Sequence, residues 1–239
     1  MPLPRRPSTG RAAAANPLAE LLTAAAAGHP PPSDGAIEVV PQPPGPVAGV
    51  LAFDGHHVVA ADIDPAWVRE RLPAGDLGAP MHARFLGALG DRLGRTWDNL
   101  DAVFVGHGQA GEVRLPLEPV DAHHDHPRVA RAHGYRFDSA VYELPHAHGL
   151  LIVGRGLAGR WEAAFEVAPD QRGQGLGRRL ARSALCLVPE GEPVFVQVAP
   201  GNVSSLRAVL GAGGYRPFGA EVLFPDPINE ARPGVPPPP

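Results

Sequence analysis

Short runs dominated by apolar and β-branched residues recur along the chain, separated by glycine, proline, asparagine or aspartate residues. This pattern is typical of strands joined by turns. It predicts strands over residues 37–40, 47–53, 57–63, 100–105, 113–120, 135–144, 150–153, 161–167, 194–198 and 220–224. Asp54-Gly55 separates the second run from the third, and this residue pair favours a hairpin turn.

Other segments place apolar residues three or four positions apart, which is the spacing of one helix face. They predict helices over residues 65–72, 82–93, 127–133, 174–188 and 203–210, and a short helix around Leu18, Leu21 and Leu22. Several antiparallel neighbours followed by one crossover helix favour an α/β (α+β) fold. We expect a mixed, mostly antiparallel sheet with helices on both faces.

The chain divides into four parts by composition. Residues 1–35 contain alanine, arginine and a proline-rich stretch, and we expect them to be largely disordered or a linker. Residues 36–112 predict a small N-terminal α/β unit, whose function its residues do not indicate. Residues 113–225 predict a second domain, and residues 226–239 end in four prolines and predict a disordered tail.

Composition narrows the classes of function. The 239 residues include 44% hydrophobic ones, which is enough for a core, and carry a net charge of -4 without a dense basic run, which argues against a nucleic-acid partner. No lysine occurs, so lysine-dependent Schiff-base chemistry is excluded. A single cysteine and the lack of a long apolar run predict a cytoplasmic protein that does not associate with membranes.

A glycine-rich turn lies between a predicted strand and a predicted helix, at residues 171–177. Unpaired backbone N–H groups and the positive end of a helix dipole meet at such a turn, and this arrangement binds phosphate. A Walker loop would need Lys followed by Ser or Thr, but Arg178 and Arg179 follow the last glycine. A Rossmann fingerprint would need a small residue at the position of Arg178, so both patterns fail.

The hexapeptide Arg172-Gly173-Gln174-Gly175-Leu176-Gly177 resembles the acyl-CoA pyrophosphate loop of the GNAT N-acetyltransferase superfamily. A second block agrees with it: residues 202–208 resemble the family's N-x-x-S-x-R helix, and residues 213–217 resemble its following glycine-aromatic turn. The resemblance covers residues 150–224 and extends towards residue 113. It implies a GNAT fold with an N-terminal α/β extension, and an acetyl-CoA-dependent N-acetyltransferase that needs no metal. The alternative is a degenerate acyl-CoA-binding or regulatory module.

The same resemblance implies which residues bind the donor. The strand at 161–167 should part from the strand at 194–198, leaving a gap in which the pantetheine arm adds as a further strand. Asn202 should contact that arm, cap the following helix, or do both. The implied acetyl-CoA contacts are Phe165, Val167, Arg172, Gly173, Gln174, Gly175, Leu176, Gly177, Arg178, Asn202 and Ser205.

Two carboxylates are candidates for the base that deprotonates the amine. Glu162 and Glu166 lie four positions apart on one predicted strand, so their side chains share a face. Beside a cleft, burial would raise the pKa of such a carboxylate and suit it to proton transfer, and Glu162 is the preferred candidate. Where the family often has a tyrosine that protonates the thiolate, this chain has Val209, which leaves Ser205, a water molecule or no acid.

His123-His124-Asp125-His126 groups imidazoles with a carboxylate, but adjacent positions rarely converge on one ion. We therefore expect a polar loop before Pro127. The acceptor is expected to be a small-molecule or peptide amine, and a homodimer is possible. The N-terminal unit could shape the acceptor pocket, a dimer contact or a protein-interaction surface.

Overall fold

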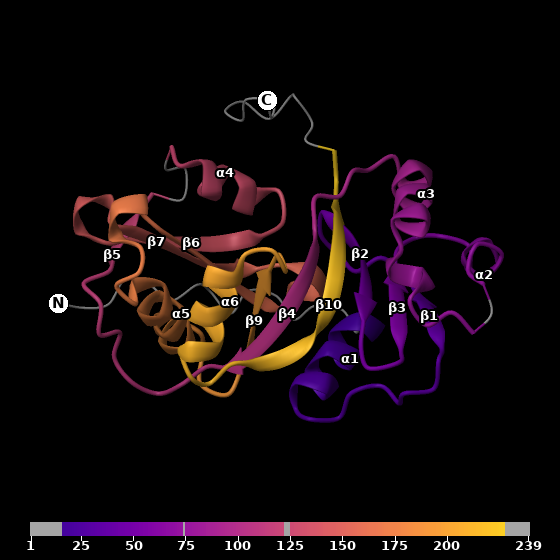
Figure 1. Ribbon diagram of the computed structural model, residues 1–239, viewed down its shortest axis with the longest axis horizontal. Helices are drawn as coiled ribbons and strands as arrows, with labels where there is room; N and C mark the ends of the chain where they lie inside the picture. The colour runs from indigo at the N-terminus through magenta and orange to yellow at the C-terminus, as the bar shows by residue number, and fades with distance from the viewer. Residues whose placement is uncertain (1–15, 74, 122–124, 228–239) are drawn as a thin grey trace.

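The computed structural model describes residues 16–73, 75–121 and 125–227. Its strands form one ten-stranded sheet in the order β1-β3-β2-β10-β4-β9-β8-β7-β6-β5 (Figure 1). The β1/β3 and β8/β9 pairs are parallel and the others are antiparallel. The strands are β1 Ile37–Val40, β2 Val47–Ala52, β3 His57–Ala60, β4 Leu100–His107, β5 Glu118–Val120, β6 Phe137–Glu143, β7 Gly149–Arg155, β8 Trp161–Val167, β9 Pro193–Val198 and β10 Arg216–Pro225.

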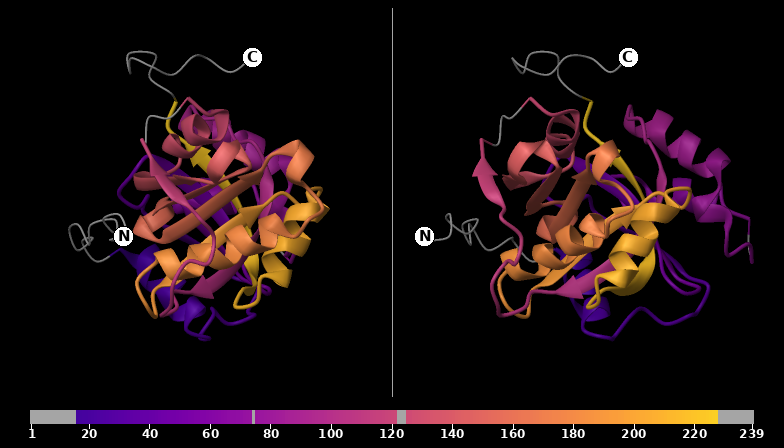
Figure 2. Two further views of the ribbon diagram at one scale, coloured as in Figure 1. Left: turned by 90° about the vertical axis from the view of Figure 1, so that its left-hand side faces the viewer. Right: turned by 60° about the vertical axis from the view of Figure 1, so that its left-hand side comes forward.

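Helices cover both faces of this sheet (Figures 1 and 2). They are α1 Pro17–Ala26, α2 Pro65–Arg69, α3 Ala83–Leu93, α4 Pro127–His133, α5 Leu176–Leu187 and α6 Val203–Gly211. Side chains alternate along β4, so Phe104 joins the core under α5 and α6, whereas Val103 and Val105 join the core under α1. The fold class expected from the sequence, a mixed and mostly antiparallel sheet with helices on both faces, is confirmed.

The segment before residue 36 is more ordered than its composition predicts. Asn16 caps α1 by accepting hydrogen bonds from the backbone N–H groups of Leu18 and Ala19, at 3.0 and 3.3 Å. Leu18 and Leu22 are fully buried against the sheet. Arg216 donates to carbonyl oxygens in the last turn of the helix. The expectation of a largely disordered segment is therefore wrong for α1, while residues 1–15 lie outside the described residues.

The boundary expected between residues 112 and 113 does not separate two domains. The strand β4 precedes that boundary, yet it pairs with β9 on one side and with β10 on the other. Phe104 lies opposite Val196 in this register and packs in the core beneath α5. The N-terminal part of the chain therefore supplies a central strand of the sheet, and residues of both expected units pack in the same hydrophobic clusters.

The remaining element predictions differ from the structure mainly at their ends. The Asp54-Gly55 hairpin is confirmed, and Gly55 adopts the left-handed φ of 68° that the turn needs. The strand predicted over residues 113–120 is reduced to β5, which begins two residues after Pro116. Of the predicted tail, Asp226 pairs with Arg95, and residues 228–239 lie outside the described residues. Of the described helices, none has the length and apolar character needed to cross a bilayer.

Candidate functional site

A cavity opens where β8 and β9 part. The two strands pair only at their beginnings, where Trp161 lies opposite Val194 and Glu162 opposite Phe195. Beyond this point the strands diverge, as the sequence resemblance implied. A cavity of about 470 Å³ lies at the divergence, and its walls come from β8, β9, α4, the start of α6 and the residues around the start of β4.

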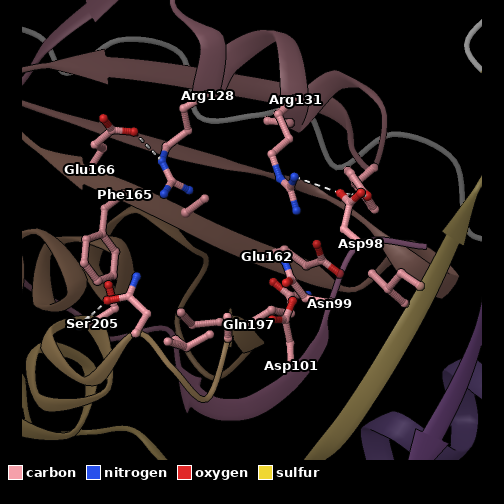
Figure 3. Close-up of a pocket in the computed structure, with 18 of the residues that line it drawn as sticks. Asp98, Asn99, Asp101, Arg128, Arg131, Glu162, Phe165, Glu166, Gln197 and Ser205 are labelled. Carbon is pink, nitrogen blue, oxygen red and sulfur yellow. Dashed lines mark hydrogen bonds and ion pairs between the residues drawn. The ribbon is translucent and has the colours of Figure 1, made fainter. Parts of the chain in front are cut away.

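The cavity has two ends, which Figure 3 separates clearly. The first contains Phe165, Glu166 and Ser205, with Asn202 hydrogen-bonded to Ser205. It is here called the donor end, because the sequence resemblance implies that acetyl-CoA, the acetyl donor, binds there. The second is here called the acceptor end, after the amine acceptor that the sequence resemblance implies. It is formed by six residues that lie just before β4, at the start of β4, on α4 or in the segment that follows α4. They are Asp98, Asn99, Asp101, Arg131, Tyr135 and Arg136.

The glycine-rich turn lies just beyond the donor end, after the last residue of β8. Gly173 and Gly175 have φ values of 79° and 77°, a region that residues with a Cβ rarely adopt, and α5 begins at Leu176. Within the described part of the chain, the backbone N–H groups from Gly173 to Arg178 have no hydrogen-bond acceptor. The turn therefore presents a row of free donors at the N-terminus of a twelve-residue helix.

Packing links this turn to the cavity wall. A Cβ atom at Gly177 would lie 3.4 Å from the Cβ of Ala208 on α6 and 3.6 Å from the ring of Phe165. Val167, at the end of β8, also contacts this glycine position, although it is not part of the cavity wall. The first turn of α5 therefore packs closely against α6 and β8, beside the donor end.

The two arginines near the turn have different surroundings. The exposed Arg172 donates from its Nε to the carbonyl oxygen of Val167 at 3.1 Å, which ties the turn to the end of β8. Arg178 is also exposed, and its aliphatic part lies beside Gly211 at the end of α6. Neither side chain is part of the cavity wall.

Asn202 and Ser205 bring the start of α6 to the donor end. The Asn202 Oδ1 accepts hydrogen bonds from the backbone N–H of Ser205 at 3.1 Å and from the Ser204 hydroxyl at 3.0 Å. Asn202 is thus the N-cap of α6, which confirms the capping role. Val209 is fully buried, and the Tyr215 hydroxyl donates to the Ala181 carbonyl oxygen in the core at 3.0 Å.

The expectation that Glu162 has a raised pKa is wrong. Its carboxylate is fully buried and lies 2.8 Å from the Nε of Arg160 and 2.9 Å from the Nε of Arg136. Burial alone would raise the pKa of Glu162, but these two guanidinium groups outweigh it and lower the pKa below its ordinary value. A carboxylate held in this way is a poor proton acceptor at neutral pH.

Arg160 extends this contact into a buried network. Its guanidinium also pairs with the buried carboxylate of Glu221 on β10, so one arginine bridges two acids. Arg136 donates in addition to the Gln197 Oε1 on β9 at 3.1 Å. The network joins β8, β9 and β10 beneath the cavity, and we assign Glu162 to this structural network.

Glu166 shares a face with Glu162, as the spacing predicted, because β8 pairs with β7 in an unbroken register and the two residues lie four positions apart. It lies towards the exposed end of β8, and its carboxylate accepts a hydrogen bond from the Nε of Arg128 on α4 at 2.9 Å. Both side chains of this pair are about one third exposed, at 37% and 35%. Glu166 therefore belongs to a charged pair at the rim of the cavity.

The sequence did not single out the acidic residues of the acceptor end. Asp98 accepts a hydrogen bond from the Tyr135 hydroxyl at 2.8 Å and pairs with the Nη1 of Arg131 at 2.8 Å. Asp101 lies opposite Glu221 on the neighbouring strand. Burial, followed by the negative charge of Glu221, raises the pKa of Asp101 from 3.8 to about 6. A carboxylate at the start of an otherwise apolar strand is the one sequence signal that would have pointed to Asp101.

The histidine cluster before α4 is only partly described, because His123 and His124 lie outside the described residues. His126 is the N-cap of α4, and its Nδ1 accepts a hydrogen bond from the backbone N–H of Arg128 at 3.1 Å. Among the described residues, no group of three or more histidine, cysteine, aspartate or glutamate side chains is arranged to hold a metal ion.

No protein-family model matches the chain, and no curated protein matches it in sequence. Solved structures do match it over part of its length. A GNAT-family acetyltransferase from Colwellia psychrerythraea is 13% identical with a TM-score of 0.38, and the match covers 61% of this chain and 63% of that one. A structure described as an acetyltransferase of the GNAT family from Novosphingobium aromaticivorans is 16% identical with a TM-score of 0.42, with 56% and 68% covered.

Proposed function

We propose that this protein is an acetyl-CoA-dependent N-acetyltransferase that transfers an acetyl group to a primary amine by direct attack on the thioester. One observation carries the proposal: β8 and β9 part beside a glycine-rich turn whose backbone N–H groups are free. An anion-binding turn at one end of an opened strand pair suits a ligand with a pyrophosphate and an extended amide-containing arm. The motif resemblance at residues 172–177 and 202–208 supports the same ligand.

The turn would hold the pyrophosphate of CoA through backbone groups. The N–H groups from Gly173 to Arg178 have no partner among the described residues, and the dipole of α5 adds a partial positive charge at this turn. Lysine is not needed for such a site, which is consistent with a chain that contains none. Arg172 adds a nearby positive charge while its Nε holds the end of β8.

The open edge of β8 would hold the pantetheine arm. Beyond Glu162 this edge has no pairing with β9, so its main-chain N–H and C=O groups are available to an added strand. One such N–H would polarise the thioester carbonyl of the bound donor. Asn202 and Ser205 form the facing wall, and the Ser205 hydroxyl or a water molecule would protonate the departing thiolate.

Thermal denaturation with and without CoA and acetyl-CoA tests the donor site. A ligand that binds only the native state at about 100 times its dissociation constant stabilises it by about 2.7 kcal/mol, so we expect a clear rise in Tm. Release of free thiol with a panel of primary amines then tests transfer. Absence of stabilisation by either nucleotide would contradict the proposal, whereas stabilisation without turnover would favour a module that only binds acyl-CoA.

A further inference from the structure

The charged side chains that line the cavity form ion pairs, with one exception. Three arginines line it, and each has a carboxylate partner: Arg128 pairs with Glu166, Arg131 with Asp98 and Arg136 with Glu162. Asp101 also lines the cavity, and among the described residues it has no ion pair and no side-chain hydrogen bond. The cavity therefore has one carboxylate without a cation, and this carboxylate lies at the acceptor end.

The groups around Asp101 explain why this carboxylate is exceptional. Glu221 faces it from β10, and Glu221 is already paired with Arg160 in the buried network. Asp98 lies three residues before it, while Arg131 on α4 and Arg136 after α4 act from across the cavity. Two of these neighbours are acids, and each nearby arginine already contacts another acid. The local field thus favours the arrival of a further cation.

We propose that Asp101 is the carboxylate that binds the ammonium group of the acceptor and removes its proton, and that the acceptor is a cationic primary amine. This inference rests on the proposed acetyltransferase function. It assigns to the N-terminal part of the chain, through β4, the residue that receives the second substrate. The remaining residues of the acceptor end then form the wall around the amine.

The step balances without a further reactant. The Asp101 carboxylate takes a proton from R–NH₃⁺, which leaves R–NH₂ with a free electron pair on nitrogen. That pair forms the bond to the thioester carbonyl carbon, and the carbon–sulfur bond breaks, its electrons leaving with sulfur. The thiolate gains the second proton of the nitrogen, and Asp101 releases its proton to solvent, so that the products are the amide, the thiol and one proton.

The other two carboxylates of the cavity are less suited to this role. Both oxygens of Glu162 contact arginine side chains, and its lowered pKa makes it a weak base. Glu166 is held by Arg128 at the rim. Asp101, with its pKa near 6, is ionised at neutral pH and is a stronger base than an ordinary aspartate. Its half-buried, unpaired charge is unfavourable for folding, which is the usual mark of a functional group.

Replacement of Asp101 by Asn keeps the size of the side chain and removes the base. For the alkylamine that the wild-type protein acetylates fastest, we expect kcat/KM at pH 7.5 to fall by about 10²–10³-fold. The wild-type rate should decline below about pH 6, where Asp101 gains a proton. The variant should lack this limb and should recover part of its rate above about pH 9, where free amine is present.

Two controls separate this inference from the function on which it rests. Asp91→Asn makes the same change on the exposed surface of α3 and should leave the rate and its pH profile unchanged. Stabilisation by CoA should be equal in the wild-type and Asp101→Asn proteins, because the donor end is intact. A wild-type rate and pH profile in the Asp101→Asn variant would overturn the inference and leave the proposed function standing. Lack of CoA stabilisation in every variant would overturn the proposed function itself.

Discussion

The two ends of the cavity differ in the groups that they offer to a ligand: main-chain groups at one end and charged side chains at the other. Beside the donor end lie main-chain groups without a partner among the described residues: the N–H groups of the turn at residues 173–178 and the edge of β8 beyond Glu162. The acceptor end depends on charged side chains, with Asp98 and Asp101 near the start of β4 and Arg131 on α4. A main-chain site recognises a shape and a phosphate, whereas a side-chain site recognises a particular charge pattern.

This difference teaches where specificity resides. Backbone donors are the same in every sequence, so the donor end can be kept while most of its side chains vary. The acceptor end can be altered by a single substitution, because one unpaired carboxylate determines its charge. Substitutions at the two ends should therefore have separable effects, on donor affinity at one end and on acceptor turnover at the other.

The largest effect is expected from the buried network beneath both ends. Arg160→Met leaves the Glu221 carboxylate buried without a cation and removes one of the two cations of Glu162. We expect the free energy of unfolding to fall by about 3–5 kcal/mol, measured by urea denaturation. Arg92→Met on the exposed side of α3 is the control and should change stability by less than about 0.5 kcal/mol. Equal stability of the two variants would show that the network does not support the cavity.

Gly175→Val is expected to affect the donor end alone. Its left-handed φ of 77° strains any residue with a Cβ, and the altered turn would misplace the N–H groups. We expect CoA affinity, measured by calorimetry, to fall by about 100-fold, while KM for the amine stays unchanged. Gly191→Val imposes the same strain at φ 82° in a turn outside the cavity wall, and its CoA affinity should equal that of the wild type. A rise in the amine KM of the Gly175 variant would contradict the separation of the two ends.

The Asp101→Asn substitution should stabilise the fold, in contrast to its effect on activity. The native state binds the Asp101 proton more tightly than the unfolded state does, since its pKa is raised from 3.8 to about 6. The contribution of this group to the free energy of unfolding therefore falls as pH rises from about 4 to about 6. Above that range Asp101 is ionised in both states, and its charge destabilises the native state to the full extent. Because Asp101 is partly exposed to solvent, we expect a gain of only about 1 kcal/mol at pH 8. The gain should vanish near pH 4 in urea denaturation; a gain that is independent of pH would indicate another cause.

The smallest effect is expected at the rim. Arg128→Gln breaks the pair with Glu166, whose members are both about one third exposed, so the free energy of unfolding should fall by less than about 1 kcal/mol. The effect should shrink further at 1 M salt, where charges on the surface are screened. Arg207→Gln on α6 provides a matched surface control. A loss larger than that of Arg160→Met would mean that the rim, and not the buried network, holds the cavity together.

The donor end could be predicted from the sequence because its parts are local. The strand, the turn and the helix from residue 161 to residue 187 follow one another along the chain, and glycine spacing directly reports the backbone conformation. Asn202 and Ser205 lie within one helical turn, so their mutual contact also follows from spacing.

The acceptor end could not be predicted because it depends on strand order. Nothing in the local sequence places Asp101 beside Glu221, which lies more than a hundred positions further along the chain. The lowered pKa of Glu162 has two causes, of which one is local in the sequence and the other is not. Arg160 precedes β8 directly and lies only two positions from Glu162, so the sequence could have indicated this partner. Arg136 reaches Glu162 only through the tertiary fold.

The central position of β4 also determines when the protein can fold during synthesis. This strand leaves the ribosome long before its two neighbours, β9 and β10, because residues 108–192 are made in between. Until then both edges of β4 are open. When β4 emerges, Val103 and Val105 can already pack against earlier residues such as Leu18 and Leu51, but none of the other buried residues in the cluster of Phe104 has been made. The nascent chain therefore exposes a strand with two open edges, which is prone to aggregation, while residues 108–192 are made. A fragment that ends before β9 should need a chaperone to stay monomeric.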